Sequence, residues 1–295
     1  MSTEDISPRY LDLDTWSAGE QVAALHDGQV EAVAAVRPAL AAIGLAVEAA
    51  AERLRQGGRI IYAGAGTSAR IGVQDGAELL PTFSWPADRV AFVIAGGEAA
   101  LLRAVENAED SAEDGAQRIE VLGVGANDVV LGIAASGNTP FTVAAVKTAR
   151  ERGALTIGIA NNAGTQLLVA SHHPVLIETG PEAIAGSTRL KAGTAQKVAL
   201  NLFSTALMAQ LGRVYRGMKV DMRPTNAKLR LRSEQMVAKI AGCAVAMAAD
   251  ALRKADGDIK AASLVALGLG VGEAVALLAK HDGNLRKALA ESGRA

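Results

Sequence analysis

The sequence predicts a doubly wound parallel α/β sheet, preceded by helices and followed by a small helical appendage. In the middle of the chain, apolar segments alternate with helix-like segments. This repetition is typical of a parallel sheet that helices cover on both faces. Several of the apolar segments are rich in Ile, Val and Ala at every position, as expected for strands buried on both sides. After about residue 221, helical patterns continue without strand-like segments.

The first part of the chain, residues 1–56, is expected to form a helical segment. The motif Ser17-Ala-Gly-Glu20 is a capping box that begins a short helix. A longer helical pattern runs from Gly28 to Leu54, with apolar residues mostly three and four positions apart. Pro38 lies inside this pattern, so we expect a kink or a break there. The Gly57-Gly58 pair ends the pattern.

The central part, residues 57–220, is expected to form the sheet. The predicted strands are Arg59–Ala63, Arg89–Ala95, Asp128–Ala134, Leu155–Ala160 and Pro174–Glu178. The predicted helices of this part are Ala69–Leu80, Glu98–Asn107, Pro140–Arg152 and Leu190–Leu211. In such a sheet, ligands bind outside the carboxyl ends of the strands.

The last part, residues 221–295, is expected to form the helical appendage after a connector near Asp221–Arg232. The predicted helices are Ser233–Arg253, Ile259–Leu267 and Gly272–Leu289. No internal repeat is evident in the sequence.

Composition limits the class of partner. The 295 residues carry a net charge of −1 and a pI near 6.5, which gives no reason to expect nucleic acid or an anionic membrane as a partner. Cys243 is the one cysteine, and there are four histidines, so we expect no disulfide and no metal cluster.

Met1–Pro8 is polar and acidic, unlike a signal peptide. No apolar run approaches the roughly 20 residues that cross a bilayer. We therefore expect a cytoplasmic protein.

Three short segments are dense in glycine and hydroxyl side chains: Gly64–Ser68, Ala134–Pro140 and Gly186–Lys197. The first two follow strand-like runs and precede helix-like stretches. Such a loop offers backbone N–H groups, hydroxyl donors and the positive end of a helix dipole, which together bind phosphate. Two such loops favour one anion held from two sides over tight turns with helix caps. The candidate binding residues are Gly66, Thr67, Ser68, Ser136, Gly137, Asn138 and Thr139.

The third segment adds Ser187 and Lys191 as candidate binding residues, because it places positive charge beside hydroxyl groups. Helix capping and subunit packing explain the same residues equally well.

Two acidic positions are candidates for proton transfer. Glu78 lies ten residues beyond Ser68, about 15 Å along an unbroken helix. Its apolar neighbours favour partial burial, which would raise the pKa of its carboxyl and suit a general acid. From the residues alone, an exposed glutamate at a helix end explains Glu78 better. Glu109 belongs to an acidic cluster with Glu106 and Asp110, whose composition alone indicates a solvated face.

The Ser136-Gly-Asn-Thr139 loop after a buried strand resembles the sugar isomerase (SIS) domain, a flavodoxin-like fold that binds phosphosugars. Three further segments resemble the N-acetylmuramic acid 6-phosphate etherase family more specifically: Asp75–Thr82, Glu106–Asp110 and Gly186–Lys197. The resemblance runs from about Asp12 to the C-terminus. It implies that Glu78 and Glu109 are the two functional carboxylates. The sequence departs from the family pattern at Ala69 and Asn107, where glycine is usual.

The resemblance implies cleavage of the D-lactyl ether of N-acetylmuramic acid 6-phosphate, giving N-acetylglucosamine 6-phosphate and D-lactate during recycling of cell-wall amino sugars. Lactate would be eliminated and water added, with Glu78 as the acid, Glu109 as the base and no cofactor. It also implies a homodimer with the site near the interface. The small residues of the helical pattern from Gly28 to Leu54 are suited to pairing, although this stretch can instead cover its own sheet.

Two other functions are compatible with a phosphosugar-binding fold. A non-catalytic phosphosugar sensor would have no need of both Glu78 and Glu109, and a DNA-binding sensor would carry a basic helix-turn-helix segment. A phosphosugar isomerase would not explain the long match over Gly186–Lys197.

Overall fold

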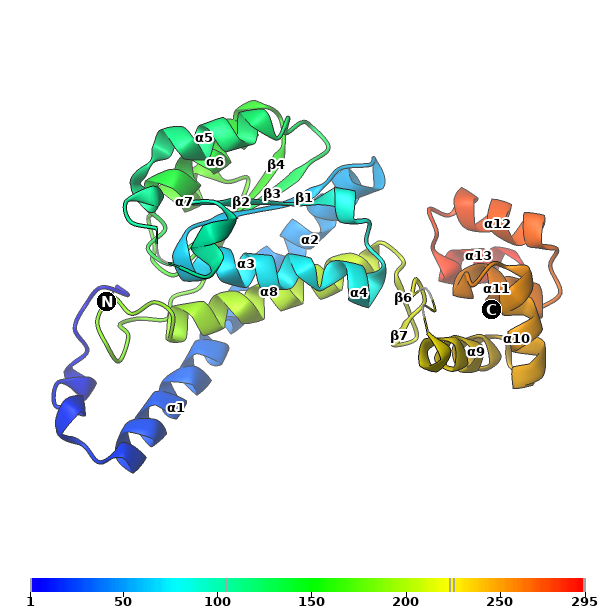
Figure 1. The fold of residues 1–295 in the computed structure, drawn as a ribbon, viewed down its shortest axis with the longest axis horizontal. Helices are drawn as coiled ribbons and strands as arrows, with labels where there is room; N and C mark the ends of the chain where they lie inside the picture. The colour runs from blue at the N-terminus through cyan, green and yellow to red at the C-terminus, as the bar shows by residue number, and fades with distance from the viewer. Residues whose placement is uncertain (1, 104, 223, 225, 294–295) are drawn as a thin grey trace. The chain divides into compact units, whose positions relative to one another are not determined.

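The computed structural model describes residues 2–103, 105–222, 224 and 226–293 (Figure 1). The chain divides into two compact units. The first comprises Met1–Ala77 and Asp88–Ser204, and the second comprises Glu78–Ala87 and Thr205–Ala295.

In the part of the chain that the structure describes, the first unit is built on a parallel five-stranded sheet with the order β2-β1-β3-β4-β5. The strands are β1 (Ile60–Gly64), β2 (Val90–Ile94), β3 (Val129–Ala134), β4 (Leu155–Ala160) and β5 (His173–Leu176). This order is that of flavodoxin-like doubly wound folds, so the predicted fold class is confirmed. Strands β1, β3 and β4 are buried at every position, as their continuous apolar composition predicts.

Helices cover both faces of this sheet. Figure 1 shows α5, α6 and α7 on one face, and α2, α3 and α8 on the other. Their bounds are α2 (Leu40–Arg55), α3 (Gly66–Ala77), α5 (Ala112–Val121), α6 (Pro140–Glu151), α7 (Gln166–Ala170) and α8 (Lys191–Gln210). The sequence did not predict α5 or α7.

The N-terminal helical segment has the predicted start and the predicted break. Helix α1 (Ala18–Ala35) begins at the capping box of Ser17 and Glu20. A 3-10 turn around Pro38 separates α1 from α2. Helix α2 packs on β5 and β4.

One face of the stretch Ala18–Arg55 is left exposed, and it carries large apolar side chains: Val22, Val30, Val33, Leu40 and Leu45. By length and composition this stretch is apolar enough to cross a membrane, so the expectation that no apolar run approaches that length is wrong. The core helix of a soluble protein meets the same criterion.

The predicted helix Glu98–Asn107 is wrong. The structure has a 3-10 turn at Glu98–Leu101 instead, and Asn107 has a φ of 58°, which no helix allows. Residue 104 of this prediction lies outside the described residues. The predicted helix Ala69–Leu80 is divided by a turn at Glu78, the first residue of the second unit, and α4 (Leu79–Phe83) follows this turn.

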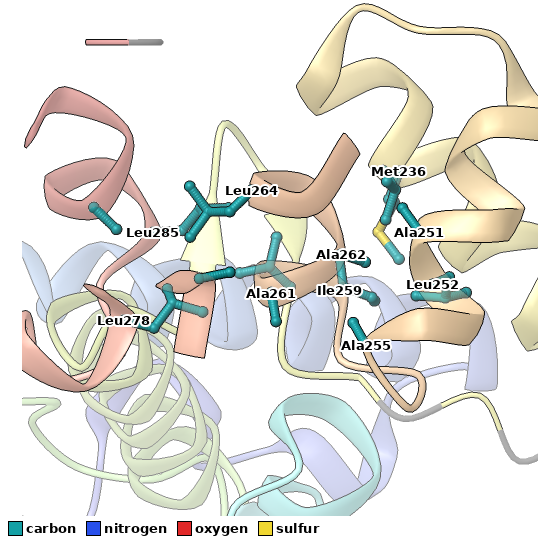
Figure 2. Close-up of a cluster of buried hydrophobic side chains, with 14 of the residues drawn as sticks. Met236, Ala251, Leu252, Ala255, Ile259, Ala261, Ala262, Leu264, Leu278 and Leu285 are labelled. Carbon is teal, nitrogen blue, oxygen red and sulfur yellow. The ribbon is translucent and has the colours of Figure 1, made fainter. Parts of the chain in front are cut away.

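The second unit confirms the helical appendage. Its helices are α9 (Ala227–Ala241), α10 (Val245–Lys254), α11 (Ile259–Ala266), α12 (Val271–Lys280) and α13 (Leu285–Glu291), and β6 (Val214–Tyr215) pairs with β7 (Met218–Lys219). These helices have a core of their own (Figure 2), which includes Met236, Leu252, Ile259, Leu264, Leu278 and Leu285. Glycines divide two of the predicted helices, at Gly242 and at Gly283, where φ is 64° and 73°.

Two of the turns that join helices in the appendage have the same geometry. The turn Asp256-Gly257-Asp258 joins α10 to α11, and Asp282-Gly283-Asn284 joins α12 to α13. In both turns, two residues of positive φ precede an Asp or Asn side chain that caps the next helix. The first helical residue is then a buried Ile259 or Leu285. The two turns therefore share one backbone geometry and one capping pattern.

An ion pair joins the amino ends of β1 and β3. Arg59 Nη2 lies 2.7 Å from Asp128 Oδ2, and Asp128 also accepts the backbone N–H groups of Arg59 and Gly125. Burial by itself would raise the pKa of Asp128, but the hydrogen bonds from Arg59 and Gly125 outweigh it and hold that pKa below its ordinary value. Because the folded state favours the charged carboxylate, its contribution to stability is present at neutral pH and is lost as pH falls below about 4.

Asp128→Asn should therefore lower the free energy of unfolding by about 2–3 kcal/mol at pH 7. Urea denaturation of both proteins at pH 7 and pH 3 measures the effect. The difference between them should shrink at pH 3, because the carboxyl of the unfolded wild-type chain is then largely protonated and the advantage of the charged form in the folded state is partly lost. An equal difference at both values would show that the charge of Asp128 does not stabilise the fold.

Candidate active site

The two glycine- and hydroxyl-rich loops emerge side by side, because β1 and β3 are hydrogen-bonded neighbours in the sheet. Helix α3 follows β1 on one face, and α6 follows β3 on the other (Figure 1). The chain thus leaves the two strands in opposite directions. In open parallel sheets this switch point forms the crevice that binds ligands.

A cavity of about 410 Å³ lies at this switch point. The first loop contributes Gly66, Thr67 and Ser68, and the second contributes Ser136, Asn138 and Thr139. The rest of the lining is Glu4, Ala65, Glu109, Asp110, Ala134, Ala135, Pro140, Gly186 and Thr188. The structure therefore brings six of the predicted binding residues and Glu109 to one cavity.

The second loop is a tight turn whose hydroxyl groups lie close together. Ser136 Oγ and Thr139 Oγ1 are 3.4 Å apart, and the Asn138 N–H donates to Ser136 Oγ over 3.2 Å. Gly137 is buried with a φ of 68°, and a Cβ there would lie 2.3 Å from Thr165 Oγ1. Gly137 therefore shapes the turn and is not among the residues that line the cavity.

The amino end of α6 adds a positive potential to the same wall. Thr139 precedes Pro140, the first residue of the helix, and its side chain makes no capping hydrogen bond. Both residues line the cavity. The free N–H groups and the dipole at such a helix end favour a bound anion.

Glu109 differs from these donors because its carboxylate can only accept hydrogen bonds, and it lies exposed in the 3-10 turn Ala108–Asp110. It also lines an adjoining cavity of about 340 Å³, which shares Ala65, Gly66 and Thr67 with the first. Arg70 and Arg103 line the adjoining cavity. Glu109 is thus the acidic residue common to both spaces.

Glu78 has a different position. It occupies the turn between α3 and α4, belongs to the second unit, and is not among the residues that line either cavity. Its side chain is exposed, so the expected partial burial is wrong. Leu79, which is 1% exposed, takes the buried position of this turn instead.

The third segment reaches the cavity through Gly186 and Thr188, and not through the two residues that the sequence singled out. Lys191 is buried, with its Nζ 3.6 Å from Glu31 Oε2 and its stem beside Gly28 of α1. Ser187 is not among the lining residues. For Lys191 the structure therefore favours packing, the alternative that the sequence left open.

A buried carboxylate fixes the start of α8 after this segment. Glu182 is 0% exposed and accepts the backbone N–H groups of Lys191 and Ala192 over 2.8 and 2.9 Å. A negative charge at a helix amino end is stabilised by the helix dipole. Glu182 thereby holds the segment that brings Thr188 to the cavity.

Sequence reasoning missed Glu4, which lines the cavity. The adjacent Thr3 is fully buried, and its N–H donates to Asn162 Oδ1 over 3.0 Å. Asn162 Nδ2 in turn donates to Thr3 Oγ1 and to the carbonyl of Ala135, just before the second loop. These hydrogen bonds hold the N-terminal segment against the cavity wall, and they cannot be predicted from local sequence patterns. Across the described residues, no group of three or more His, Cys, Asp or Glu side chains is arranged to hold a metal ion.

Comparison with known folds agrees with this architecture. Residues 42–150 match the family model of the glucokinase regulatory protein N-terminal SIS domain, and residues 98–206 match the SIS domain. A phosphoheptose isomerase from Francisella tularensis superposes with a TM-score of 0.52 at 18% identity, over 66% of this chain and 100% of that chain. At that identity the likeness shows the fold alone.

Comparison with curated proteins extends over nearly the whole chain. A protein from Deinococcus radiodurans is 48% identical over 290 residues, which cover 98% of this chain and 95% of that protein. A protein from Rubrobacter xylanophilus is 48% identical over 295 residues, which cover 99% of this chain and 97% of that protein. Both are named N-acetylmuramic acid 6-phosphate etherase. The chain therefore belongs to the N-acetylmuramic acid 6-phosphate etherase family.

Proposed function

We propose that this protein is an enzyme that cleaves the D-lactyl ether of N-acetylmuramic acid 6-phosphate, giving N-acetylglucosamine 6-phosphate and D-lactate. The observation that carries the proposal is the cavity at the switch point, where donor-rich loops and the carboxylate of Glu109 share one space. Family membership at 48% identity supports the same reaction.

The phosphate group binds at the second loop in this proposal. Ser136 and Thr139 offer hydroxyl donors, and the amino end of α6 offers a positive potential. Binding by these groups is present in the ground state and in the transition state alike, so it anchors the substrate without favouring one step.

The reaction is difficult because an alkoxide is a poor leaving group. In the ring-opened sugar, C2 is adjacent to the C1 aldehyde, so a base can remove its proton. The C3–O bond then breaks, a C2=C3 double bond forms, and the lactate oxygen takes a proton from an acid. Water next adds its hydroxyl to C3 and a proton to C2. Two carboxyl groups in different protonation states meet these needs.

We assign the base to Glu109 and the acid to Glu78. A proton-transfer group must come within hydrogen-bonding reach of its substrate atom. Glu109 lines the cavity, but Glu78 follows the carboxyl end of α3, about 15 Å along the helix from Ser68. We therefore infer that Glu78 acts in the cavity of a second copy of the chain.

A homodimer would satisfy this need. The exposed apolar side chains of α1 and α2 provide a surface for pairing, since Val22, Val30 and Leu45 are 67%, 57% and 61% exposed. Contiguous exposed apolar residues mark interaction sites, and two identical chains commonly pair about a two-fold axis. The dimer would place one Glu78 at each of two cavities.

We place the enzyme in the cytoplasm, where cell-wall amino sugars are recycled after phosphorylation. A sugar phosphate is charged and does not cross a bilayer unaided. The near-neutral net charge of −1 gives no basis for nucleic acid as a further partner.

The direct test of the reaction is incubation with N-acetylmuramic acid 6-phosphate, followed by assays of D-lactate and N-acetylglucosamine 6-phosphate. Equal amounts of the two products are expected, and a chelator should not reduce them. Complete loss of activity in chelator would refute the metal-free mechanism. Tight binding of the phosphosugar without release of lactate would favour the sensor function instead.

The shared site has its own test, a mixture of the inactive variants Glu78→Gln and Glu109→Gln. If these residues come from different chains, each heterodimer contains one intact site. Subunit exchange should then restore about a quarter of native activity. A monomer by sedimentation would refute the dimer, and a stable dimer without restored activity would place both residues on one chain.

Phosphate anchoring predicts a separable kinetic effect. Ser136→Ala and Thr139→Ala should each raise KM by about 10-fold or more with a smaller change in kcat, because each removes a hydrogen bond to a charged group. Thr148→Ala, on α6 but away from the cavity lining, is the matched control. Equal turnover of the unphosphorylated sugar by the wild-type enzyme would contradict this role.

A further inference from the structure

A buried carboxyl group lies in the last turn of α3, and the proposed mechanism does not use it. Asp75 is 3% exposed and is not among the residues that line either cavity. Its carboxylate accepts hydrogen bonds from Tyr62 Oη over 2.9 Å, from Asn201 Nδ2 over 2.8 Å and from Ser204 Oγ over 3.0 Å. Tyr62 belongs to β1, and Asn201 and Ser204 belong to α8. Asp75 therefore ties the end of α3 to the sheet and to α8 at the same time.

These hydrogen bonds require an acceptor at position 75. Lys197 Nζ donates to Asn201 Oδ1 over 2.6 Å, and an ammonium group can only donate, so Asn201 presents its NH₂ group to Asp75. Burial raises the pKa of Asp75, and the hydrogen bonds from its three donors oppose that rise. An apolar side chain at this position would avoid the cost of burying a carboxylate. It would not fix the helix in one position, however, because hydrogen bonds are directional and apolar contacts are not.

The next residue, Gly76, holds the same end of α3 by close packing. A Cβ at Gly76 would lie 2.6 Å from Phe92 Cε1 and 2.8 Å from Tyr62 Cε2. The two rings are stacked, with their centroids 5.8 Å apart. Only glycine lets the helix lie this close to the rings. The end of α3 is thus fixed at two consecutive positions, by hydrogen bonds at Asp75 and by packing at Gly76.

The chain reaches Glu78 two residues after Gly76, through Ala77, the last residue of α3. Glu78 keeps a right-handed helical backbone, with φ of −79° and ψ of −12°, and its side chain makes no capping hydrogen bond. The backbone position of Glu78 is thus set by the end of α3. We propose that Asp75 is a positioning residue that holds Glu78 where its carboxyl reaches the departing lactate oxygen. The inference rests on the proposed function, in which Glu78 is the acid and acts in the cavity of a second copy.

Two variants of different severity test this role in the full-length protein. Tyr62→Phe removes one donor to Asp75 and keeps the ring that packs against Gly76. It should reduce kcat for release of D-lactate about 10-fold, and Asp75→Ala about 100-fold, since a displacement of about 1 Å at a reacting group costs up to about 10²-fold. KM and the exchange of the C2 proton with solvent should stay within about two-fold of the native values, because neither depends on Glu78. If Asp75→Ala does not fold, Tyr62→Phe carries the test.

Two comparisons separate positioning from general stability. Asp128→Asn weakens the same unit at the amino ends of the strands, so it is the matched control for loss of a buried carboxylate. It should leave the ratio of lactate release to C2 exchange at the native value. The second comparison adds Tyr62→Phe to Glu78→Gln. Because the group that Asp75 positions is then absent, the residual release of lactate should fall by less than about two-fold.

The outcomes distinguish this inference from the function on which it rests. If Tyr62→Phe and Asp75→Ala release D-lactate at the native rate while Glu78→Gln does not, the inference is overturned and the function stands. An equal loss of cleavage and exchange in either variant also overturns it, because Asp75 would then support the whole site. Full additivity of Tyr62→Phe and Glu78→Gln has the same meaning. Lactate release at the native rate in Glu78→Gln removes the acid from the proposed mechanism, and the inference fails with it.

Discussion

Replacement of Glu109 by glutamine should reduce ether cleavage by about 10²–10⁴-fold, the usual contribution of a general base. It should reduce exchange of the C2 proton with solvent by a similar factor. Glutamine keeps the shape of the side chain and fits the same exposed turn, but it cannot accept a proton at neutral pH. Because deprotonation at C2 comes first in the proposed mechanism, its loss should suppress every later step.

Two measurements on the same sample check this result: release of D-lactate, and incorporation of deuterium at C2 in heavy water. Glu113→Gln is a matched control, because Glu113 is an exposed glutamate in the first turn of α5 that does not line either cavity. Exchange at the native rate in Glu109→Gln would assign the base to another group. Glu4 and Asp110 would be the next candidates, since they line the same cavity.

Glu78→Gln should reduce release of D-lactate by about 10²–10⁴-fold as well, but it should leave exchange at C2 in place. In the proposed mechanism Glu78 supplies the proton that the departing lactate oxygen takes, and glutamine has no acidic proton to give. Removal of the C2 proton is a separate step and needs only Glu109. Both variants should therefore lose ether cleavage, but only Glu109→Gln should lose exchange of the C2 proton with solvent.

The same pair of assays applies to Glu78→Gln, with Glu151→Gln as the control. Glu151 is an exposed glutamate at the last residue of α6, and it does not line either cavity. Lactate release near the native rate would remove Glu78 from the mechanism. Loss of exchange together with cleavage would mean that Glu78, and not Glu109 alone, controls the first step.

The sequence was sufficient for the parts of the fold that have a strong local signal. Strands β1, β3 and β4 begin or end within one residue of their predicted bounds, because strands buried on both faces require continuous apolar composition. Pro38 predicted the break between α1 and α2 for a similarly local reason, since proline cannot continue a helix at that point.

Local patterns failed where longer-range packing decides the conformation. The predicted helix Glu98–Asn107 is absent over its described residues, where Asn107 instead has a left-handed φ of 58°. The likeness of the turns Asp256-Gly257-Asp258 and Asp282-Gly283-Asn284 becomes evident from their shared positive φ values and side-chain caps. Exposure of Glu78 was misjudged because its apolar neighbour Leu79 takes the buried position alone.

By itself, the sequence determined which segments hold the hydroxyl groups, since glycine, serine and threonine after a buried strand specify a tight loop before a helix. Only the tertiary structure decided that these loops share one cavity, because strand order is set by packing of the whole sheet and places β1 beside β3. It also brought Glu4 to that cavity, whereas Lys191 packs against α1 and pairs with Glu31. Ser68 and Ser136 are the same residue type in similar loops, yet Ser68 Oγ contacts Gln196 of α8 while Ser136 Oγ contacts Thr139 of its own loop, because packing of the whole chain sets their neighbours.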